Sequence, residues 1–329
     1  MAINWVGKKV LVTGANGFLA SWIVKKLIEK KANITSLVYE QIPFSMFDLD
    51  GFKKLTKVIH GDILDFPMLQ KLIQEQEIEM VFHVGAQAIN KTAISSPYKT
   101  LETNIRGTYN LLEAIRLVSP STKIIVASSD KAYGIHNTMP YKETFSLHGE
   151  YPYEVSKSCA DLISSAYFNT YKLPICIVRS GNIYGEGDWH FSRVVPSTII
   201  RIHKDLPPLL ISETERDYVY AEDVANGYLK LGEAMLDGLK GEAFNFGRGK
   251  PVKTSVLLKT ILEVMDKNSL GIVKSDEKRM EIPVQYLSIE KAKKMIGFAA
   301  PTELKKGLEN TVKWYITHID KVLESKLED

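Results

Sequence analysis

The chain is poor in cysteine and has no hydrophobic run of membrane-spanning length. Its 329 residues include two cysteines, Cys159 and Cys176, which cannot form a disulfide framework and which we expect to be reduced core residues. No apolar stretch approaches the ~20 residues that cross a bilayer. The first residues, Met1–Trp5, lack the basic and apolar regions of a signal peptide. We therefore expect a soluble, cytoplasmic protein without a membrane partner.

A large net charge and metal-ligand spacing are also absent. A formal charge of +3 is too small to indicate nucleic acid as the main partner. The residues His83, His136, His190 and His203 show no spacing typical of a metal site, so we predict no bound metal. The composition, 45% apolar and 25% charged, is typical of a globular protein long enough for a large domain and a smaller lobe.

The first 180 residues alternate short apolar runs with helical patterns. Strands are expected at 9–13, 34–39, 58–59, 80–84, 123–127 and 175–179. Helices are expected at 18–30, 65–76, 100–118 and 153–171. Short, almost uniformly apolar strands separated by helices are typical of a parallel sheet covered on both faces. The predicted fold class is therefore α/β, a doubly wound parallel sheet of the Rossmann type.

The alternation breaks after Arg179. We expect a loop at 181–189, helices at 196–203, 221–233, 254–266, 288–296 and 302–324, and strands at 207–211 and 241–246. Residues 1–180 are predicted to form the sheet domain, with about 217–247 returning to it. Residues 181–329 are predicted to form mainly a smaller lobe over the carboxyl ends of the strands, where ligands bind in open α/β sheets.

A glycine-containing turn, Thr13–Ala20 (TGANGFLA), follows the first strand and begins a helix. Gly14 permits a tight turn, Gly17 lets backbone N–H groups approach a pyrophosphate at the positive end of the helix, and Ala20 is the third small position. An ordinary glycine-containing turn is the alternative, but the context favours a dinucleotide site. Other expected coenzyme contacts in this turn are Asn16, Phe18 and Leu19.

The residues at the end of the second strand indicate whether the coenzyme is NAD or NADP. An acidic residue there binds the ribose hydroxyls and repels a 2′-phosphate. Glu40 lies two residues after the expected position, Val38, and no Arg or Lys lies between Tyr39 and Gly51. We therefore favour NAD, with Glu40 as a ribose ligand. Asp62 and Ile63, after the third strand, suit the adenine edge, although a surface turn explains them nearly as well.

Small residues end the fourth strand. Val84, Gly85 and Ala86 let backbone lie against a coenzyme, and Gln87 is placed to reach coenzyme or substrate. Asn104 lies in the following helix, where it is expected to hold a water or a backbone carbonyl near the site. A solvent-facing Asn104 is the alternative.

A tyrosine and a lysine stand four residues apart in Tyr153–Lys157 (YEVSK), so that both lie on one face of the expected helix. A phenol beside an ammonium loses its proton more easily, so Lys157 is expected to lower the pKa of Tyr153. Such a pair can take an alcohol proton while hydride leaves the same carbon for a nicotinamide. The pattern also occurs by chance, and its value here comes from the preceding motifs.

Ser128, Ser129, Asp130 and Lys131 follow the fifth strand directly, so their side chains are expected at the carboxyl edge of the sheet. A hydroxyl there can hold the oxygen that Tyr153 deprotonates. Asp130 and Lys131 add an acid and a possible base, which simple alcohol oxidation does not need. A capping Asp and a solvated Lys are the alternative.

Later polar residues suit a nucleotide diphosphate. The candidates are Asn182, Arg193 and Arg216. Arginine suits such a site because its planar guanidinium matches phosphate oxygens. A surface salt bridge is the alternative for either arginine.

Together these motifs resemble the extended short-chain dehydrogenases/reductases that modify nucleotide sugars, over essentially the whole chain. The resemblance includes TGANGFLA, the set Ser129, Tyr153 and Lys157, and the segments 179–185, 216–223 and 244–247. Within this family, the segments 128–133, 152–157 and 181–189 with 193–196 resemble CDP-glucose 4,6-dehydratases most. Related dehydratases carry Asp-Glu where this chain has Asp130-Lys131, and sugar 4-epimerases usually have no such pair. Segment 39–43 matches the CDP-glucose branch loosely, and segment 216–220 is more similar to epimerases and dTDP-sugar enzymes.

The resemblance implies bound NAD, a nucleotide-diphosphate-sugar substrate and an internal redox cycle ending in a 4-keto-6-deoxy sugar. It assigns the C4 proton to Tyr153, the C4 oxygen to Ser129 and the departing 6-hydroxyl to Asp130. A 4-epimerase using Ser129, Tyr153 and Lys157 is the alternative. The resemblance also implies a homodimer paired through helices at about 100–118 and 153–171, supported by apolar residues that could equally face their own sheet: Leu162, Ile163 and Phe168.

Overall fold

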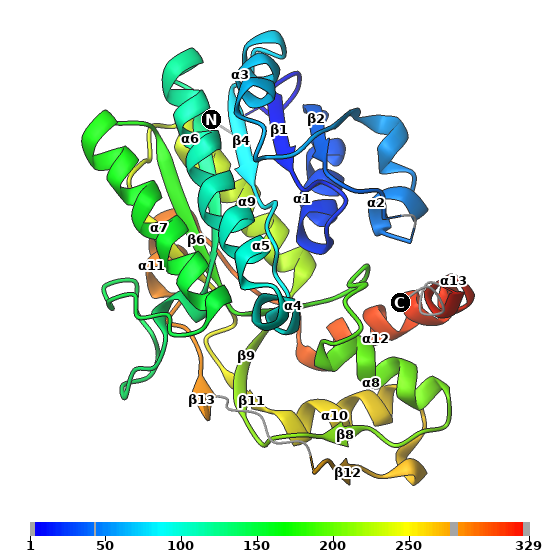
Figure 1. Cartoon of the computed structure of the whole chain (residues 1–329). Coiled ribbons are helices and arrows are strands. Elements are labelled where there is room, and N and C mark those ends of the chain that lie inside the picture. Colours follow the sequence, from blue (N-terminus) through cyan, green and yellow to red (C-terminus); the bar gives the residue numbers. More distant parts are fainter. Residues whose placement is uncertain (1–3, 43, 277–281, 325–329) are drawn as a thin grey trace.

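The computed structural model describes residues 4–42, 44–276 and 282–324. Within them, a parallel sheet of seven strands has the order β10-β6-β5-β4-β1-β2-β3 (Figure 1). The strands are β1 (Lys9–Thr13), β2 (Asn33–Val38), β3 (Lys57–His60), β4 (Met80–His83), β5 (Lys123–Ser129), β6 (Ile175–Ser180) and β10 (Ala243–Phe246). The predicted doubly wound α/β fold is confirmed.

Helices cover both faces of this sheet because its strand residues alternate between two apolar layers. Val10 and Val12 of β1 point to one layer and Leu11 to the other. The first layer contains α1 (Phe18–Glu29) and α9 (Ala221–Leu236), and the second contains α3 (Phe66–Glu75), α6 (Gly107–Val118) and α7 (Pro152–Tyr171), as Figure 1 shows. Strands buried on both faces explain the nearly continuous apolar runs in the sequence.

The expected helix at 100–118 is interrupted. The chain forms α4 (Asn90–Ser95), α5 (Pro97–Leu101), a π-helical turn η2 (Glu102–Arg106), and then α6. A π-helical turn widens one turn of the helix, and such turns often occur at functional sites. This turn carries Asn104 with 2% of its surface exposed, which rules out the solvent-facing alternative.

A second, smaller sheet is separate from the seven-stranded sheet. Its central strand β9 (Glu215–Tyr220) pairs with β7 (Asn182–Tyr184), β11 (Pro251–Lys253) and β13 (Val284–Gln285). The loop expected at 181–189 is therefore wrong for residues 182–184, and β9, β11 and β13 were not predicted. These strands are short and their partners lie far away along the chain, so their local sequence carries little signal.

The second sheet packs with α8 (Val194–His203), α10 (Thr254–Val264) and α12 (Leu304–Thr317) around a core that includes Tyr184, Tyr220 and Leu308. The expected helix at 302–324 divides at His318 into α12 and α13 (Ile319–Glu324).

The division into domains stays a prediction, although β10 joins the large sheet and α9 packs against it. The remaining elements are α2 (Met46–Leu49), η1 (Phe52–Leu55), η3 (Asp130–Tyr133), β8 (Leu209–Leu210), η4 (Asn268–Leu270), β12 (Val273–Lys274) and α11 (Glu290–Ile296). None of the helices in the described ranges is long and apolar enough to span a bilayer.

Candidate active site

The turn between β1 and α1 forms a cradle that only glycine allows. Gly14 has φ +63°, and a Cβ there would lie 2.7 Å from the Cα of Gly85. Gly17 begins α1 without a side-chain hydrogen bond to the helix start. Asn16 donates from Nδ2 to the Glu40 carbonyl oxygen at 2.6 Å, which ties the turn to the end of β2. An uncapped helix start beside closely packed backbone fits a bound pyrophosphate.

A buried chain of polar groups supports this turn. The Thr13 hydroxyl oxygen accepts from the backbone N–H groups of Val84 and Gly85 at 3.1 and 2.9 Å, so its proton points to His83 Nδ1 at 3.0 Å. The Thr108 hydroxyl donates to the Asn104 carbonyl at 2.6 Å, so it accepts from His83 Nε2 at 3.1 Å. Both neighbours therefore fix one neutral tautomer of His83.

Burial and, to a smaller extent, the charge of Lys157 lower the pKa of His83 to about 3. A neutral His83 keeps a second positive charge away from Lys157. The sequence predicts His83 only as a non-ligand and carries no signal for the link of His83 to Thr13 and Thr108.

The residues after β4 are fixed by Asn104. Its side chain accepts from the Gln87 backbone N–H at 2.8 Å and donates to the Gln87 carbonyl and to Ser156 Oγ, both at 2.9 Å. The Gln87 side chain donates to the Ile89 carbonyl at 3.1 Å and accepts from Thr100 at 3.3 Å. Asn104 therefore braces η2, the end of β4 and α7, and its direct contact with a coenzyme stays a prediction.

The other predicted coenzyme contacts lie at the same edge of the sheet. The Glu40 side chain is exposed just after β2. Asp62 accepts the Leu64 backbone N–H at 2.9 Å, while Ile63 is buried against Gly107. One Asp62 oxygen thus stabilises its own turn.

Tyr153 and Lys157 lie on the first two turns of α7. Lys157 is 6% exposed and donates from Nζ to the Ala127 carbonyl at 2.8 Å, and burial lowers its pKa to about 8. Burial also raises the pKa of the half-buried Tyr153, outweighing the charge of Arg193 and a hydrogen bond with Ser129. This net direction is opposite to the predicted lowering, because desolvation of the phenolate exceeds the stabilisation by nearby positive charge.

The end of β5 brings hydroxyl and carboxyl groups to the phenol. Ser129 Oγ donates to Asp130 Oδ1 at 3.2 Å and accepts the Lys131 backbone N–H at 3.2 Å. Asp130 is 2% exposed, and its Oδ2 lies 3.9 Å from Lys131 Nζ. Among the described residues, Ser128 Oγ and Asp130 Oδ2 are buried without a hydrogen-bond partner. Such atoms are rare in folded proteins and fit a site that a ligand completes.

The predicted substrate residues lie in two parts of the structure, near the Tyr153 phenol and in the second sheet. Arg193 donates to Asp188 Oδ1 at 3.0 Å, and its charge acts on Tyr153, so it belongs to the group around the phenol. Arg216 is 6% exposed in β9 and donates from Nη1 to the Pro283 carbonyl at 3.3 Å. Asn182, in β7, is partly buried and pairs with Tyr218.

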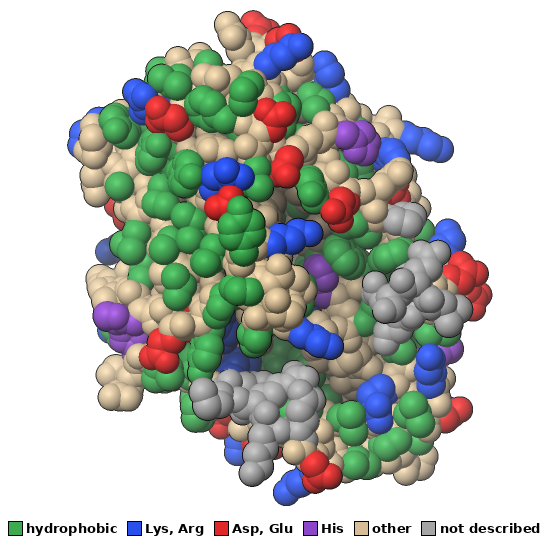
Figure 2. All heavy atoms as spheres, viewed as in Figure 1, with side chains coloured by type: hydrophobic (Ala, Val, Ile, Leu, Met, Phe, Trp, Pro, Cys, Tyr) green, Lys and Arg blue, Asp and Glu red, His purple; other side chains and the backbone are tan. Residues whose placement is uncertain are grey.

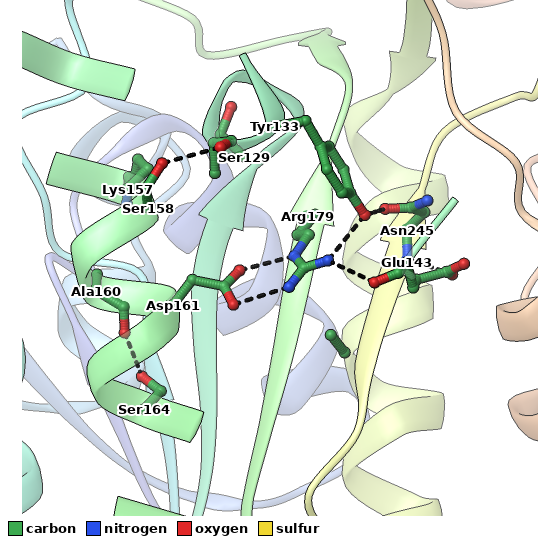
Figure 3. A network of polar contacts seen from close by, with 12 residues as sticks. Ser129, Tyr133, Glu143, Lys157, Ser158, Ala160, Asp161, Ser164, Arg179 and Asn245 are labelled. Carbon is green, nitrogen blue, oxygen red and sulfur yellow. Dashed lines mark hydrogen bonds and ion pairs between the residues drawn. The ribbon is translucent and has the colours of Figure 1, made fainter. Parts of the chain in front are cut away.

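A polar network below the site holds α7 against the sheet (Figure 3). Arg179 of β6 donates to both Asp161 oxygens, at 2.7 and 2.9 Å, and the pair is almost fully buried. Nη1 of Arg179 also donates to the Tyr133 hydroxyl at 3.0 Å, which donates to Asn245 Oδ1 at 2.7 Å. Burial raises the pKa of Tyr133 to about 12, so the hydroxyl keeps its proton. Because Tyr133 ends the η3 turn that carries Asp130 and Lys131, the network fixes the far end of that turn.

Gln285 is a further residue that sequence reasoning missed. Its carboxamide contacts the Asp130 carbonyl and the Lys131 ammonium from the second sheet. No signal in the sequence marks it, because β13 is two residues long and lies 155 positions after Asp130.

Comparison with known protein families identifies the family to which this chain belongs. A family model described as "NAD dependent epimerase/dehydratase family" matches residues 10–247. The chain belongs to this family. The predicted cofactor, NAD, is therefore confirmed at the level of the family, whose description is NAD-dependent.

Individual relatives include both dehydratases and epimerases. CDP-glucose 4,6-dehydratase of Salmonella typhimurium is 29% identical, over 94% of this chain and 91% of its own length. dTDP-glucose 4,6-dehydratase 1 of Escherichia coli is 27% identical, over 94% and 93%. Among solved structures, UDP-glucose 4-epimerase of Thermotoga maritima has a TM-score of 0.86 and 26% identity, over 94% of this chain and 99% of that one. These likenesses do not choose between the two reactions.

Proposed function

We propose that the protein is a nucleotide-sugar 4,6-dehydratase that converts a nucleoside-diphosphate hexose, with CDP-glucose favoured, to its 4-keto-6-deoxy derivative. The observation that carries the proposal is Asp130, a buried carboxyl next to Ser129 whose Oδ2 has no hydrogen-bond partner and lies 3.9 Å from the Lys131 ammonium. Loss of water needs an acid for the departing hydroxyl, whereas epimerisation does not. The likeness to CDP-glucose 4,6-dehydratase supports this substrate class.

The turn that follows β1 would hold NAD, which supplies a hydride acceptor and donor when bound. The glycines at positions 14, 17 and 85 let the backbone of the turn and of the end of β4 pack closely, since a Cβ at any of them would meet neighbouring backbone, and the start of α1 then offers its N–H groups to a pyrophosphate. The proposed coenzyme contacts are Gly14, Asn16, Gly17, Phe18, Leu19, Glu40, Asp62, Ile63, Val84, Gly85, Ala86, Asn104, Ser128, Tyr153 and Lys157.

The protein's own groups then divide the proton transfers. Tyr153 takes the C4 hydroxyl proton, and Ser129, which hydrogen-bonds the phenol, holds the C4 oxygen. The resulting 4-ketone makes the C5 proton acidic, and Lys131 removes that proton or stabilises the charge left behind. Asp130 protonates the 6-hydroxyl as it leaves as water. Return of the C4 hydride to C6 and of a proton to C5 completes a reaction whose net change is the loss of one water.

The raised pKa of Tyr153 matters for the first transfer. A buried neutral phenol is a poor base until a positive charge is added near it. The charge of Arg193 already opposes the raised pKa of Tyr153 without reversing it, and Lys157, whose pKa burial lowers to about 8, is the other cation on this part of α7 and its surroundings. Binding of the sugar diphosphate would engage Arg193, Arg216 and Asn182, with Gln87 toward the sugar.

The protein is proposed to act as a homodimer. Hydrophobic side chains gather over α5, α6 and α7 on the face shown in Figure 2. Leu162 is 58% exposed there, whereas Ile163 and Phe168 pack against their own sheet. The exposed members include Tyr98, Tyr109, Leu117, Leu162 and Tyr171. A cytoplasmic location stays a prediction.

The test is incubation of purified protein with CDP-, UDP-, dTDP- and GDP-hexoses, followed by mass and stereochemical analysis. Loss of one water from any of them supports a dehydratase, and preference for CDP-glucose supports the favoured substrate. Unchanged mass with inverted C4 configuration would instead establish the 4-epimerase, which needs only Ser129, Tyr153 and Lys157. The likeness to the Thermotoga maritima epimerase is the observation that keeps this second candidate.

A further inference from the structure

A fully buried glutamine from the second sheet contacts the Asp130–Lys131 pair. Gln285 has no exposed surface. Its Nε2 donates to the Asp130 carbonyl oxygen at 2.9 Å, and its Oε1 accepts from the Lys131 ammonium. The contact joins residues about half the chain apart, across two sheets.

The chemistry of the partners fixes the orientation of the carboxamide. A backbone carbonyl can only accept a hydrogen bond, and an ammonium can only donate one. The amide N–H therefore faces Asp130 and the amide oxygen faces Lys131. An apolar side chain can satisfy neither group, and a carboxylate has no N–H for the Asp130 carbonyl. A glutamine can satisfy both groups at once without adding a charge beside Asp130.

The backbone that follows Gln285 is itself held by hydrogen bonds. The Tyr286 carbonyl accepts from the Tyr141 backbone N–H at 2.9 Å. The Leu287 N–H donates at 3.3 Å to Asp217, which also accepts the backbone N–H groups of Arg248 and Gly249 at 2.7 and 3.0 Å. These bonds place the carboxamide before any ligand arrives, which is the condition for accurate support of a reacting group.

The same strand also touches the expected diphosphate residue. Gln285 pairs in register with Arg216, and Arg216 donates to the Pro283 carbonyl two positions earlier in the chain. The strand that pairs with the proposed diphosphate residue therefore also contacts Asp130 and Lys131.

We propose that Gln285 is a positioning residue that sets the geometry of Asp130 and Lys131 and links them to the Arg216 strand. This inference rests on the proposed dehydratase function for its kinetic consequence and on the structure alone for its effect on the 129–133 turn. It goes beyond the Ser129, Tyr153 and Lys157 set because it concerns the elimination and not the oxidation at C4.

The experiment compares the holoenzyme with Gln285→Met, which keeps the shape and removes both hydrogen bonds, and Gln285→Glu, which keeps the acceptor for Lys131. Gln74→Met, on the exposed surface of α3, is the matched control. With the nucleotide hexose that the wild type dehydrates, Gln285→Met should lower kcat for water loss by on the order of 10²-fold. The KM should stay near that of the wild type. The absorbance of reduced nicotinamide in the steady state should rise, because oxidation at C4 continues while elimination is slow. The kcat of Gln285→Glu for water loss should lie between those of the wild type and of Gln285→Met.

A second readout does not need turnover. Amide hydrogen exchange of the holoenzyme should speed up in Gln285→Met at residues 129–133, with the Thr13–Ala20 turn unchanged. Unchanged exchange at 129–133 overturns the positioning role, and so does an equal loss of oxidation and elimination. If the wild type itself releases no water from any hexose while exchange at 129–133 still rises, the dehydratase proposal fails and the positioning role stands.

Discussion

Replacement of Gly14 by alanine tests how closely the first turn approaches the end of β4. Gly14 has φ +63°, a left-handed conformation that costs an alanine about 1–2 kcal/mol. Its added Cβ would also lie 2.7 Å from the Gly85 Cα and 3.3 Å from the Gly85 nitrogen. Backbone cannot rotate away as a side chain can, so this contact should add about 1–3 kcal/mol.

Gly7 provides a matched control because it has φ +72° and no atom lies within 4 Å of the place that an added methyl group would take. Gly7→Ala should therefore show only the conformational cost, of about 1–2 kcal/mol. The free energy of unfolding from urea titration measures both variants. Their difference isolates the contact with Gly85.

The affinity for NAD gives a second measure of the contact between Gly14 and Gly85. Gly14→Ala moves the turn that is proposed to hold the pyrophosphate, so NAD affinity measured by calorimetry should fall, while Gly7→Ala should bind NAD like the wild type. Equal destabilisation and equal NAD affinity in the two variants would refute the reasoning, because the approach of Gly14 to Gly85 would then have no consequence.

Three further changes test other parts of the structure. Asp161→Asn leaves the buried Arg179 charge without its counter-charge and should lower the free energy of unfolding by about 3–5 kcal/mol; Glu113→Gln, in a more exposed pair with Arg116, should have a much smaller effect, and similar losses would contradict the role of burial. His83 has a pKa of about 3 when folded and ~6.5 when unfolded, so protonation favours the unfolded chain and stability should fall as pH drops from ~6.5 toward 3, by up to ~1.4 kcal/mol per pH unit. His83→Gln should flatten this part of the urea-measured pH profile, and an unaltered slope would exclude His83 as its source. Asp130→Asn should abolish water loss, followed by mass, yet leave some oxidation at C4; undiminished dehydration would end the role assigned to Asp130.

The large sheet was predictable because its signals are local. Strands β1, β4 and β6 are apolar on both faces, and the expected ranges 9–13, 80–84 and 175–179 end within one residue of those observed. The carboxyl ends of these strands must lie at one edge, and positions i and i+4 of a helix must share a face. These two rules were sufficient to place Ser129, Asp130 and Tyr153 near one another.

The second sheet was not predictable by the same rules. Strand β9 begins with Glu215, Arg216 and Asp217, which do not alternate as a half-buried strand does. Arg216 and Asp217 are nevertheless buried, because they bond to backbone groups of segments far along the chain. Their polar groups are satisfied only after that pairing forms, so no window of sequence around them identifies the strand.

The pKa of Tyr153 shows the same limit within the site. The sequence places a lysine four residues away and so indicates a lowered pKa, but it contains no measure of how much water the phenol loses. The structure buries the phenol and directs Lys157 Nζ to the Ala127 carbonyl, and the net direction is reversed. The phenol therefore stays protonated in the isolated chain, and a further positive charge beside it would be needed to make it a base at neutral pH. The oxidised nicotinamide of bound NAD would supply such a charge, whereas the anionic diphosphate that engages Arg193 would not. Proton abstraction would then be confined to the protein with bound NAD.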